Sequence, residues 1–239
     1  MNKKTLIVSP TYNEKDNILE LLRQIWAVNS NYDILIIDDN SPDGTGEIVK
    51  NEMTNNSKLH LIQREGKLGL GTAYCTGFKW ALDNNYDKVI QMDADLSHNP
   101  EDIPRLLDES ERSDVVIGSR YVNGVNVVNW PMRRLLLSYF ANLYAKTVIR
   151  LPIIDATGGF KCFNSKVLKS INLSLIKSEG YSFQIEMNTK SLRNGFSLKE
   201  IPIIFVDRTV GKSKMTKKII YEAAWVVIKL SLQGLFRIK

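Results

Sequence analysis

Apolar and polar positions along the first half of the chain follow the pattern of an α/β protein. Short, nearly continuous apolar runs alternate with segments that carry apolar residues at helical spacing, such as Ile18, Leu21, Leu22 and Ile25. Strands of this kind are typical of a parallel sheet that helices cover on both faces. The runs are TLIVSP (5–10), DILIIDD (33–39), LHLIQR (59–64), KVIQMDAD (88–95) and DVVIGS (114–119). The pattern predicts an α/β fold with a mostly parallel central sheet.

The second half follows a different pattern. A long amphipathic helix is predicted after Trp130 and Pro131, followed by a glycine turn in DATGGFKCF (155–163). A further helix is predicted in GYSFQIEMNTKSLRNG (180–195), and a strand in SLKEIPIIFVDR (197–208). We expect these elements to form a platform attached to the sheet, so that residues 1–215 make one domain and residues 216–239 a C-terminal helix.

The C-terminal segment predicts an amphipathic helix with two sides. Its polar side carries Lys218, Glu222, Lys229 and Gln233. Its wide apolar side carries Trp225, Ile228, Leu232 and Phe236. The charges interrupt the apolar run, so the helix is not expected to span a membrane. Three interpretations remain open: a helix in the membrane interface, a helix packed on the domain, and a helix that binds a partner.

Two carboxylates follow the apolar run at 88–95. Alternate residues of an extended chain project the same way, so Asp93 and Asp95 are predicted to converge beyond the strand. Two oxygen ligands with room for water and a diphosphate are typical of an Mg²⁺ or Mn²⁺ site. Turn chemistry is the alternative, because Asp is common in loops. Asn99 is already placed to cap the helix that opens at Pro100, which leaves both acids spare.

Asp38 and Asp39 end an earlier apolar run in the same way. An acid at such a strand end can accept hydrogen bonds from a base or ribose, or can simply close a turn. For Asp39 both interpretations stay open. The glycine-rich loops EGKLGLGTAY (65–74) and VGKS (210–213) match neither the dinucleotide fingerprint nor a P-loop, so they identify neither a dehydrogenase nor an ATPase.

Basic residues concentrate in the second half of a chain whose formal net charge is +6. Two stretches, 118–134 and 207–214, carry the basic residues of interest, which are Arg120, Arg133, Arg134, Arg208, Lys212 and Lys214. Such side chains can neutralise phosphates, although a solvated surface is the ordinary alternative. No nucleic-acid motif accompanies them, so no nucleic-acid partner is expected. The two cysteines, Cys75 and Cys162, lack zinc or disulfide spacing, which favours a reducing, cytoplasmic setting.

The motifs, taken in order, resemble the glycosyltransferase family 2 enzymes with a GT-A fold. More narrowly, they resemble the dolichol- or polyprenol-phosphate mannosyltransferases, and above all the bacterial polyprenol-phosphate mannose synthases. The motifs are PTYNE, DDNSPDGTG, KLGLGTAY, MDADLSHNPED, IGSRYVNG, NWPMRRLLLS, DATGGFKCF, GYSFQIEM and VDRTVGKSKM. Each is weak alone, but the ordered set is specific and covers nearly the whole chain. The resemblance implies that residues 1–215 form a GT-A catalytic domain.

The same resemblance implies roles for individual residues. The residues implied for the nucleoside of GDP-mannose are Pro10, Tyr12, Glu14, Ile37 and Asp39. Those implied for the diphosphate and metal are Asp93, Ala94 and Asp95, and those for the acceptor phosphate are Arg120, Arg134 and Ser138. Arg208 and Lys214 are implied near the phosphates of the reacting centre. Some relatives carry a glutamine ligand where this chain has Ser97, which would reach a metal only through water.

The implied reaction is a metal-dependent transfer of mannose to a polyprenyl or dolichyl monophosphate, with inversion. Asp93, Asp95, Arg120 and Arg208 are the implied catalytic residues. The implied partners are GDP-mannose, the lipid phosphate, a divalent Mg²⁺ or Mn²⁺ ion, the cytoplasmic membrane surface and a possible membrane protein. Two alternatives stay open: the same chemistry with UDP-glucose, and a non-catalytic nucleotide-sugar module that recruits a membrane partner.

Overall fold

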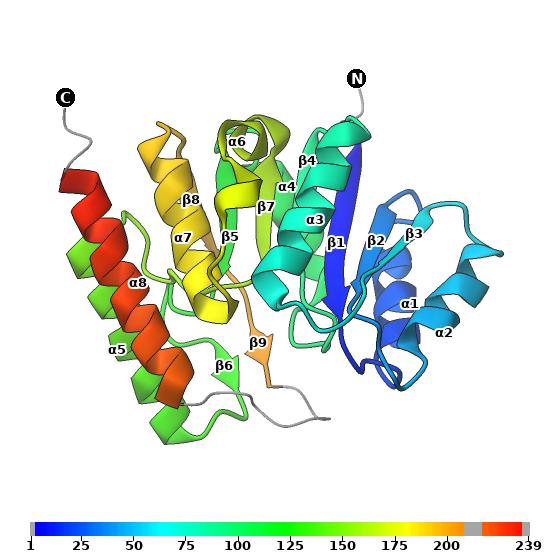
Figure 1. Cartoon of the computed structure of the whole chain (residues 1–239), viewed down its shortest axis with the longest axis horizontal. Coiled ribbons are helices and arrows are strands. Elements are labelled where there is room, and N and C mark those ends of the chain that lie inside the picture. The colour runs from blue at the N-terminus through cyan, green and yellow to red at the C-terminus, as the bar shows by residue number, and fades with distance from the viewer. Residues whose placement is uncertain (1–2, 208–216, 236–239) are drawn as a thin grey trace.

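The computed structural model describes residues 3–207 and 217–235, and its centre is a seven-stranded sheet (Figure 1). The strand order is β3-β2-β1-β4-β7-β5-β8. The strands are β1 (Thr5–Thr11), β2 (Asp33–Asp38), β3 (Leu59–Gln63), β4 (Lys88–Gln91), β5 (Val115–Ser119), β7 (Lys161–Asn164) and β8 (Leu198–Pro202). Every neighbouring pair is parallel except those of β7, which runs antiparallel to β4 and β5. The predicted α/β fold with a mostly parallel sheet is confirmed.

Strand β7 differs from the sequence prediction, which placed only a glycine turn over DATGGFKCF. The turn holds as far as Phe160, and the chain then enters the sheet between β4 and β5 at Lys161. Four residues that begin with a fully buried lysine carry neither a continuous apolar run nor a clear alternation. A second, two-stranded sheet pairs β6 (Val127–Val128) with β9 (Phe205–Val206) in parallel.

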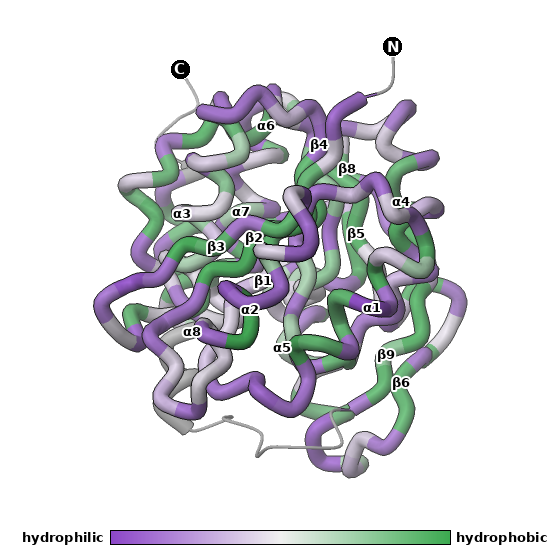
Figure 2. The backbone as a smooth tube through the Cα atoms, turned by 90° about the vertical axis from the view of Figure 1, so that its right-hand side faces the viewer, coloured by the Kyte–Doolittle hydropathy of each residue, from purple (hydrophilic) through white to green (hydrophobic). Residues whose placement is uncertain are grey.

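Helices cover both faces of the sheet. One face carries α1 (Ile18–Val28), α2 (Thr45–Met53) and α4 (Ile103–Glu109), and the other carries α3 (Leu70–Asp83), α6 (Ser165–Ser170) and α7 (Gly180–Arg193). Alternate residues of one strand enter different cores: Ile7 packs on the first face, whereas Leu6 and Val8 pack on the second. Both faces of β1, β2 and β5 are therefore apolar, which explains their continuous runs in the sequence and the hydrophobic strands in Figure 2.

Two long helices, α5 (Met132–Ile149) and α8 (Lys217–Leu235), lie side by side at the end of the molecule beyond α7 (Figure 1). Helix α8 packs on α5 and α7 through buried Val227 and Leu230. The apolar side predicted for this helix stays largely open to solvent, while Phe236 lies outside the described residues. Large apolar side chains stay exposed on both helices, and they include Leu136, Phe140 and Leu143 on α5 and Trp225, Ile228 and Leu232 on α8. Within the described ranges, no helix is long and apolar enough to cross a bilayer.

Candidate active site

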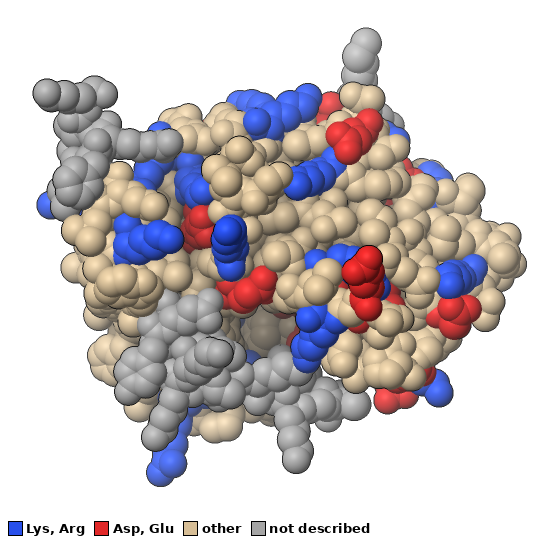
Figure 3. Space-filling model, in the orientation of Figure 1, with Lys and Arg blue, Asp and Glu red and all other residues tan. Residues whose placement is uncertain are grey.

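The candidate active site lies at the carboxyl edge of the parallel strands, as expected for an open α/β sheet. Strands β1, β2, β4 and β5 all end at this lower edge of Figure 1, so the polar motifs that follow them meet there. Hydrogen bonds tie neighbouring strand ends together, from Asp39 N to Thr11 O (3.0 Å) and from Met92 N to Val8 O (3.1 Å). In Figure 3, acidic and basic side chains both border a hollow near this edge.

The two candidate metal ligands lie in the loop after β4, which ends at Gln91 and is shorter than predicted. Asp95 Oδ1 accepts hydrogen bonds from the Ser97 hydroxyl (2.5 Å) and backbone N–H (3.2 Å). This turn requires Leu96 to adopt a φ of 61°, a conformation that is unusual for a branched, bulky residue. Such strain in a turn is common at functional sites. Asp95 therefore has a role in the turn itself, and Ser97 holds its carboxylate.

Asp93 is positioned by two buried aromatic residues that the sequence did not assign to the site. Tyr74 donates a hydrogen bond from its hydroxyl to Asp93 Oδ1 (2.6 Å), and burial next to Asp93 raises the pKa of this tyrosine well above its usual value. His98 Nδ1 accepts from the Asp93 backbone N–H (3.3 Å), and burial lowers the pKa of its imidazole. His98 is therefore neutral at pH 7 and holds the loop rather than serving as an acid.

The donor set fits a divalent ion that is shared with a substrate. No group of three or more His, Cys, Asp or Glu side chains within residues 3–207 and 217–235 could hold a metal by itself. Asp93 and Asp95 are both only partly buried. A Cβ placed on Gly159 would lie 3.3 Å from Asp93 Oδ2, so glycine keeps the approach to this carboxylate open. One or two carboxylates completed by water and phosphate oxygens form a typical Mg²⁺ site.

Asp39, a candidate nucleoside residue, is engaged by Arg64. The Arg64 guanidinium donates to Asp39 Oδ1 (2.5 Å), the Leu68 backbone N–H donates to Asp39 Oδ2 (3.2 Å), and both charged side chains are 8% exposed. Asp38 closes the turn instead, because its carboxylate accepts from Thr11 and Ser41. The two consecutive acids thus have different surroundings, and Arg64 joins the candidate site as a residue that sequence reasoning missed.

The remaining candidate donor residues lie around the ends of β1, β2 and β4. The Tyr12 ring faces the ammonium group of Lys67 at 4.2 Å, and Glu14 accepts from Asn17 (2.7 Å). Pro10 pairs with Ile37 across β1 and β2, but the Ile37 side chain is fully buried in the core. Any contact of Ile37 with a ligand would therefore be made by its backbone. Ala94, also a candidate, is buried between the two acids.

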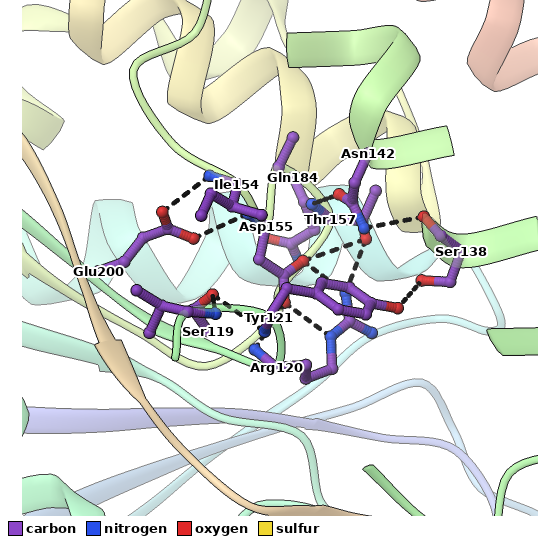
Figure 4. A network of polar contacts seen from close by, with 12 residues as sticks. Ser119, Arg120, Tyr121, Ser138, Asn142, Ile154, Asp155, Thr157, Gln184 and Glu200 are labelled. Atoms are coloured by element: carbon purple, nitrogen blue, oxygen red, sulfur yellow. Dashed lines mark hydrogen bonds and ion pairs between the residues drawn. The ribbon is translucent and has the colours of Figure 1, made fainter. Parts of the chain in front are cut away.

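Arg120 follows β5 and is the centre of a buried polar network (Figure 4). Its guanidinium donates to both carboxylate oxygens of Asp155 (2.6 and 2.7 Å) and to the Thr157 hydroxyl (2.7 Å). Burial opposes both charges, yet the Asp155 carboxylate holds the pKa of Arg120 above its usual value, and the guanidinium in turn holds the pKa of Asp155 below its own. Glu200 fixes the loop by accepting from the backbone N–H groups of Ile154 and Asp155 (both 2.7 Å).

The other candidate acceptor residues lie on α5. Arg134 forms an ion pair with Asp207 (2.7 Å), and its guanidinium carbon lies 4.2 Å from the centre of the Trp130 ring. Ser138, one turn further along α5, accepts a hydrogen bond from the Tyr121 hydroxyl (2.7 Å). The structure thus brings Arg134 and Ser138 to the same region as Arg120. Arg208 and Lys214 lie outside the described residues.

A row of aromatic rings connects the acidic and basic parts of the candidate site. The Phe205 ring lies 5.5 Å from His98 and 5.5 Å from Trp130, and it is 5.7 Å from the Arg120 guanidinium carbon. The Val206 backbone N–H donates to Ser97 O (3.3 Å), which attaches β9 to the Asp95 loop. No local sequence pattern predicts this contact, because Phe205 has the character of an ordinary strand residue.

Lys161 is a second residue that the sequence did not single out. It is fully buried, and its ammonium group reaches Asn188 Oδ1 (2.9 Å) and Gln184 O (3.3 Å). Burial lowers the pKa of this lysine to about 7, although nearby Asp155 opposes the shift. Gln184 also accepts from Gln91 (2.9 Å), so a polar layer lies beneath the Gly159 turn. The sequence could not reveal this polar layer, because it does not show that the Lys161 charge is buried.

Residues 6–171 match the model of the family described as Glycosyl transferase family 2. The chain belongs to this family. Polyprenol monophosphomannose synthase from Mycolicibacterium smegmatis is 41% identical over 234 residues, which cover 97% of this chain and 88% of that protein. Undecaprenyl-phosphate mannosyltransferase from Micrococcus luteus is 39% identical over 232 residues, which cover 97% of this chain and 94% of that protein. The family 2 chain is therefore a glycosyltransferase.

Solved structures support the same fold. Glucosyl-3-phosphoglycerate synthase from Mycobacterium tuberculosis, in complex with Mn²⁺ and UDP-glucose, superposes with a TM-score of 0.67 at 16% identity, over 98% of this chain and 80% of that one. A complex of the same enzyme with Mn²⁺, UDP and phosphoglyceric acid gives a TM-score of 0.69 at 16% identity, over 100% and 80% of the two chains. This similarity shows the GT-A type of fold, which confirms the expected fold class.

Proposed function

We propose that this glycosyltransferase moves mannose from GDP-mannose to a polyprenyl monophosphate, with inversion and with Mg²⁺ or Mn²⁺. The names of the two curated relatives support mannose and a polyprenyl phosphate as substrates. The observation that carries the proposal is that Phe205 connects the two parts of the site: it contacts His98, which holds the Asp93 backbone, and it contacts Arg120 and the Trp130 ring that Arg134 faces. A donor diphosphate with its metal and an anionic acceptor would then meet at one edge of the sheet.

The protein's contribution would be placement and charge. A bound divalent ion would neutralise the diphosphate as it leaves the sugar. Asp93 and Asp95 would hold that ion, Tyr74 and Ser97 would orient these carboxylates, and Arg120 and Arg134 would orient the acceptor phosphate. Arg208 and Lys214 are proposed near the departing diphosphate. Attack in line with the leaving group would give a β-linked mannosyl phosphate from an α-linked donor.

No general base is needed in this reaction. The second pKa of a phosphate monoester is about 6, so the acceptor is largely ionised at neutral pH. His98, the imidazole nearest the two acids, is neutral, and its Nδ1 is already used by the Asp93 backbone. The chain therefore supports nucleophilic attack by the acceptor itself. Proton transfer by a side chain has no part in the proposal.

The deciding experiment is a labelled-donor assay on liposomes that contain polyprenyl phosphate. We expect product with GDP-mannose, little with UDP-glucose, and loss of transfer when EDTA removes the metal. The substitution Asp95→Asn should reduce kcat/KM at least ~100-fold, or about 2.7 kcal/mol of barrier. Asp114→Asn is the matched control. Asp114 directly precedes β5 and accepts hydrogen bonds from Ser197, so it lies at the edge of the sheet opposite the candidate active site.

Each outcome of this assay separates the alternatives. Faster transfer from UDP-glucose would replace the proposed donor while keeping the chemistry. Transfer that persists in EDTA, or in Asp95→Asn at the wild-type rate, would remove the metal mechanism. Nucleotide-sugar binding without product, on every lipid acceptor, would favour the non-catalytic module.

We also propose that the enzyme works peripherally at the cytoplasmic membrane surface and docks there through the exposed apolar side chains of α5 and α8. Phe140 and Trp225 are 59% and 65% exposed, and burying a large apolar side chain contributes about 1.5–3 kcal/mol. The double variant Phe140→Glu, Trp225→Glu should therefore bind acceptor liposomes at least ~100-fold more weakly in a flotation assay. Leu19→Glu changes a leucine on α1 that is 49% exposed and should not alter flotation. Undiminished flotation of the double variant would place the docking surface elsewhere.

A further inference from the structure

Two buried hydrogen-bond donors that lie next to each other have no partner among the described residues. They are the indole Nε1 of Trp130 and the Nε of Arg134, and no acceptor in residues 3–207 and 217–235 lies within hydrogen-bond distance of either. The side chains face each other, since the Arg134 guanidinium carbon lies 4.2 Å from the centre of the Trp130 ring. A buried N–H without an acceptor costs free energy, so most such groups in native proteins are paired, and an exception calls for an explanation.

The surroundings favour an anion as the missing acceptor. Arg120 also lies over the Trp130 ring, with its guanidinium carbon 5.5 Å from the ring centre. Trp130 and Pro131 directly precede Met132, the first residue of the 18-residue helix α5, and the start of a long helix attracts negative charge. Two guanidiniums therefore lie against the Trp130 ring, and helix α5 begins two residues after it.

The existing carboxylates already have their own partners. Asp155 is bound by Arg120, and Asp207 accepts from Nη1 of Arg134, which leaves Nε on the other edge of that guanidinium. A single water could accept from both orphan donors, because its oxygen has two lone pairs, but it carries no charge that would offset the guanidiniums. A tetrahedral oxyanion has several oxygens, so it could accept from both N–H groups at once.

We propose that Trp130 is an acceptor-binding residue whose indole Nε1 donates a hydrogen bond to the lipid monophosphate, beside Nε of Arg134. This inference rests on the proposed function, because it takes the polyprenyl phosphate as the anion. It assigns to Trp130 a polar role in addition to the contacts of its ring with the Arg134 guanidinium and, edge-on, with the Phe205 ring. The indole would fix the orientation of the phosphate, and the arginines would supply charge.

The first test reads the indole directly by ¹⁵N NMR. The chain has four tryptophans, so four indole signals are expected, and Trp130→Phe identifies the one of interest. A soluble short-chain prenyl monophosphate should shift the Trp130 indole proton downfield, whereas the matching prenyl alcohol should not. Trp26 is the internal reference, because its indole already donates to Tyr32 O (3.2 Å) and should not move. A Trp130 signal that is unmoved at a saturating concentration of the phosphate would overturn the proposal.

The second test uses kinetics. Trp130→Phe keeps an aromatic ring and deletes the N–H, so the KM for polyprenyl phosphate should rise about tenfold, equal to ~1.4 kcal/mol, while the KM for GDP-mannose stays the same. Trp26→Phe should leave both constants unchanged. Equal rises in both constants, or no rise, would contradict a role in acceptor binding. If no donor supports transfer, the proposed function fails, and the NMR titration alone decides whether Trp130 binds phosphate.

Discussion

The two parts of the active site are held in place in different ways. Around β4, the acids follow directly from the strand, and the residue that holds Asp95 is only two positions away, at Ser97. Around β5 and α5, Arg120 and Arg134 are each held by a carboxylate from a distant segment. Arg120 and Asp155 are 35 residues apart, and Arg134 and Asp207 are 73 apart. The Asp95 turn thus depends on local backbone geometry, whereas the acceptor side depends on the tertiary fold.

This difference has an energetic consequence. The Arg120–Asp155 pair is almost completely buried, with 6% and 0% of the two side chains exposed. Desolvation makes such a pair costly to assemble, but removing one partner is more costly still, because it leaves an isolated buried charge. We therefore expect the acceptor side to be where stability and function are most closely coupled.

The largest effect is expected from Asp155→Asn. The substitution preserves shape but leaves the Arg120 guanidinium without its counter-charge, so the free energy of unfolding should fall by about 3–5 kcal/mol. The KM for polyprenyl phosphate should rise as well, because Arg120 loses the contacts that fix it. Urea denaturation measures the first effect, and the liposome assay measures the second.

The matched control for this variant is Asp207→Asn, at the partly exposed pair with Arg134. Because 13% and 20% of these side chains are exposed, solvent screens the lost charge, and the destabilisation should be about 1 kcal/mol or less. If the two variants lost similar stability, the buried network would have no special role, and the contrast between the two sides of the site would fail.

The sequence predicted the parts of the molecule that depend on local patterns and missed those that depend on tertiary contacts. The parallel sheet and its helices were predictable, because strand runs and helical spacing are local patterns. Asn99 was correctly predicted as a cap, since its side chain accepts from the Glu101 backbone. Strand β7 was missed, because its position depends on pairing with β4 and β5. No local pattern marks a four-residue strand that begins with a buried lysine.

The candidate site shows the same limit. The positions of Asp93 and Asp95 could be inferred from the sequence, although the loop geometry, with its turn at Leu96, could not. Tyr74, His98 and Phe205 support the site from separate elements, and their aromatic character looked like ordinary core packing. Similarly, the sequence could not show that Ile37 directs its side chain into the core. Residues that act through other residues carry no motif of their own.

A smaller effect is expected from Tyr74→Phe on the donor side. Phenylalanine keeps the ring stacked between Phe78 and Phe183, at 5.9 and 5.8 Å, but removes the hydroxyl that donates to Asp93. Loss of such an orienting contact typically weakens metal binding by about tenfold or more, so the Kd for Mn²⁺ in the presence of GDP should rise by about that factor. Electron paramagnetic resonance of free Mn²⁺ gives this affinity without a measurement of turnover.

Tyr121→Phe completes the comparison, because it deletes a matched buried hydroxyl on the acceptor side. Tyr121 donates to Ser138, so its loss should raise the KM for polyprenyl phosphate and leave Mn²⁺ affinity unchanged. If both tyrosine variants weakened Mn²⁺ binding equally, the hydroxyls would act through general stability rather than through their partners. If Tyr74→Phe weakened only Mn²⁺ binding and Tyr121→Phe raised only the KM for polyprenyl phosphate, each hydroxyl would act through its own partner, Asp93 on the donor side and Ser138 on the acceptor side.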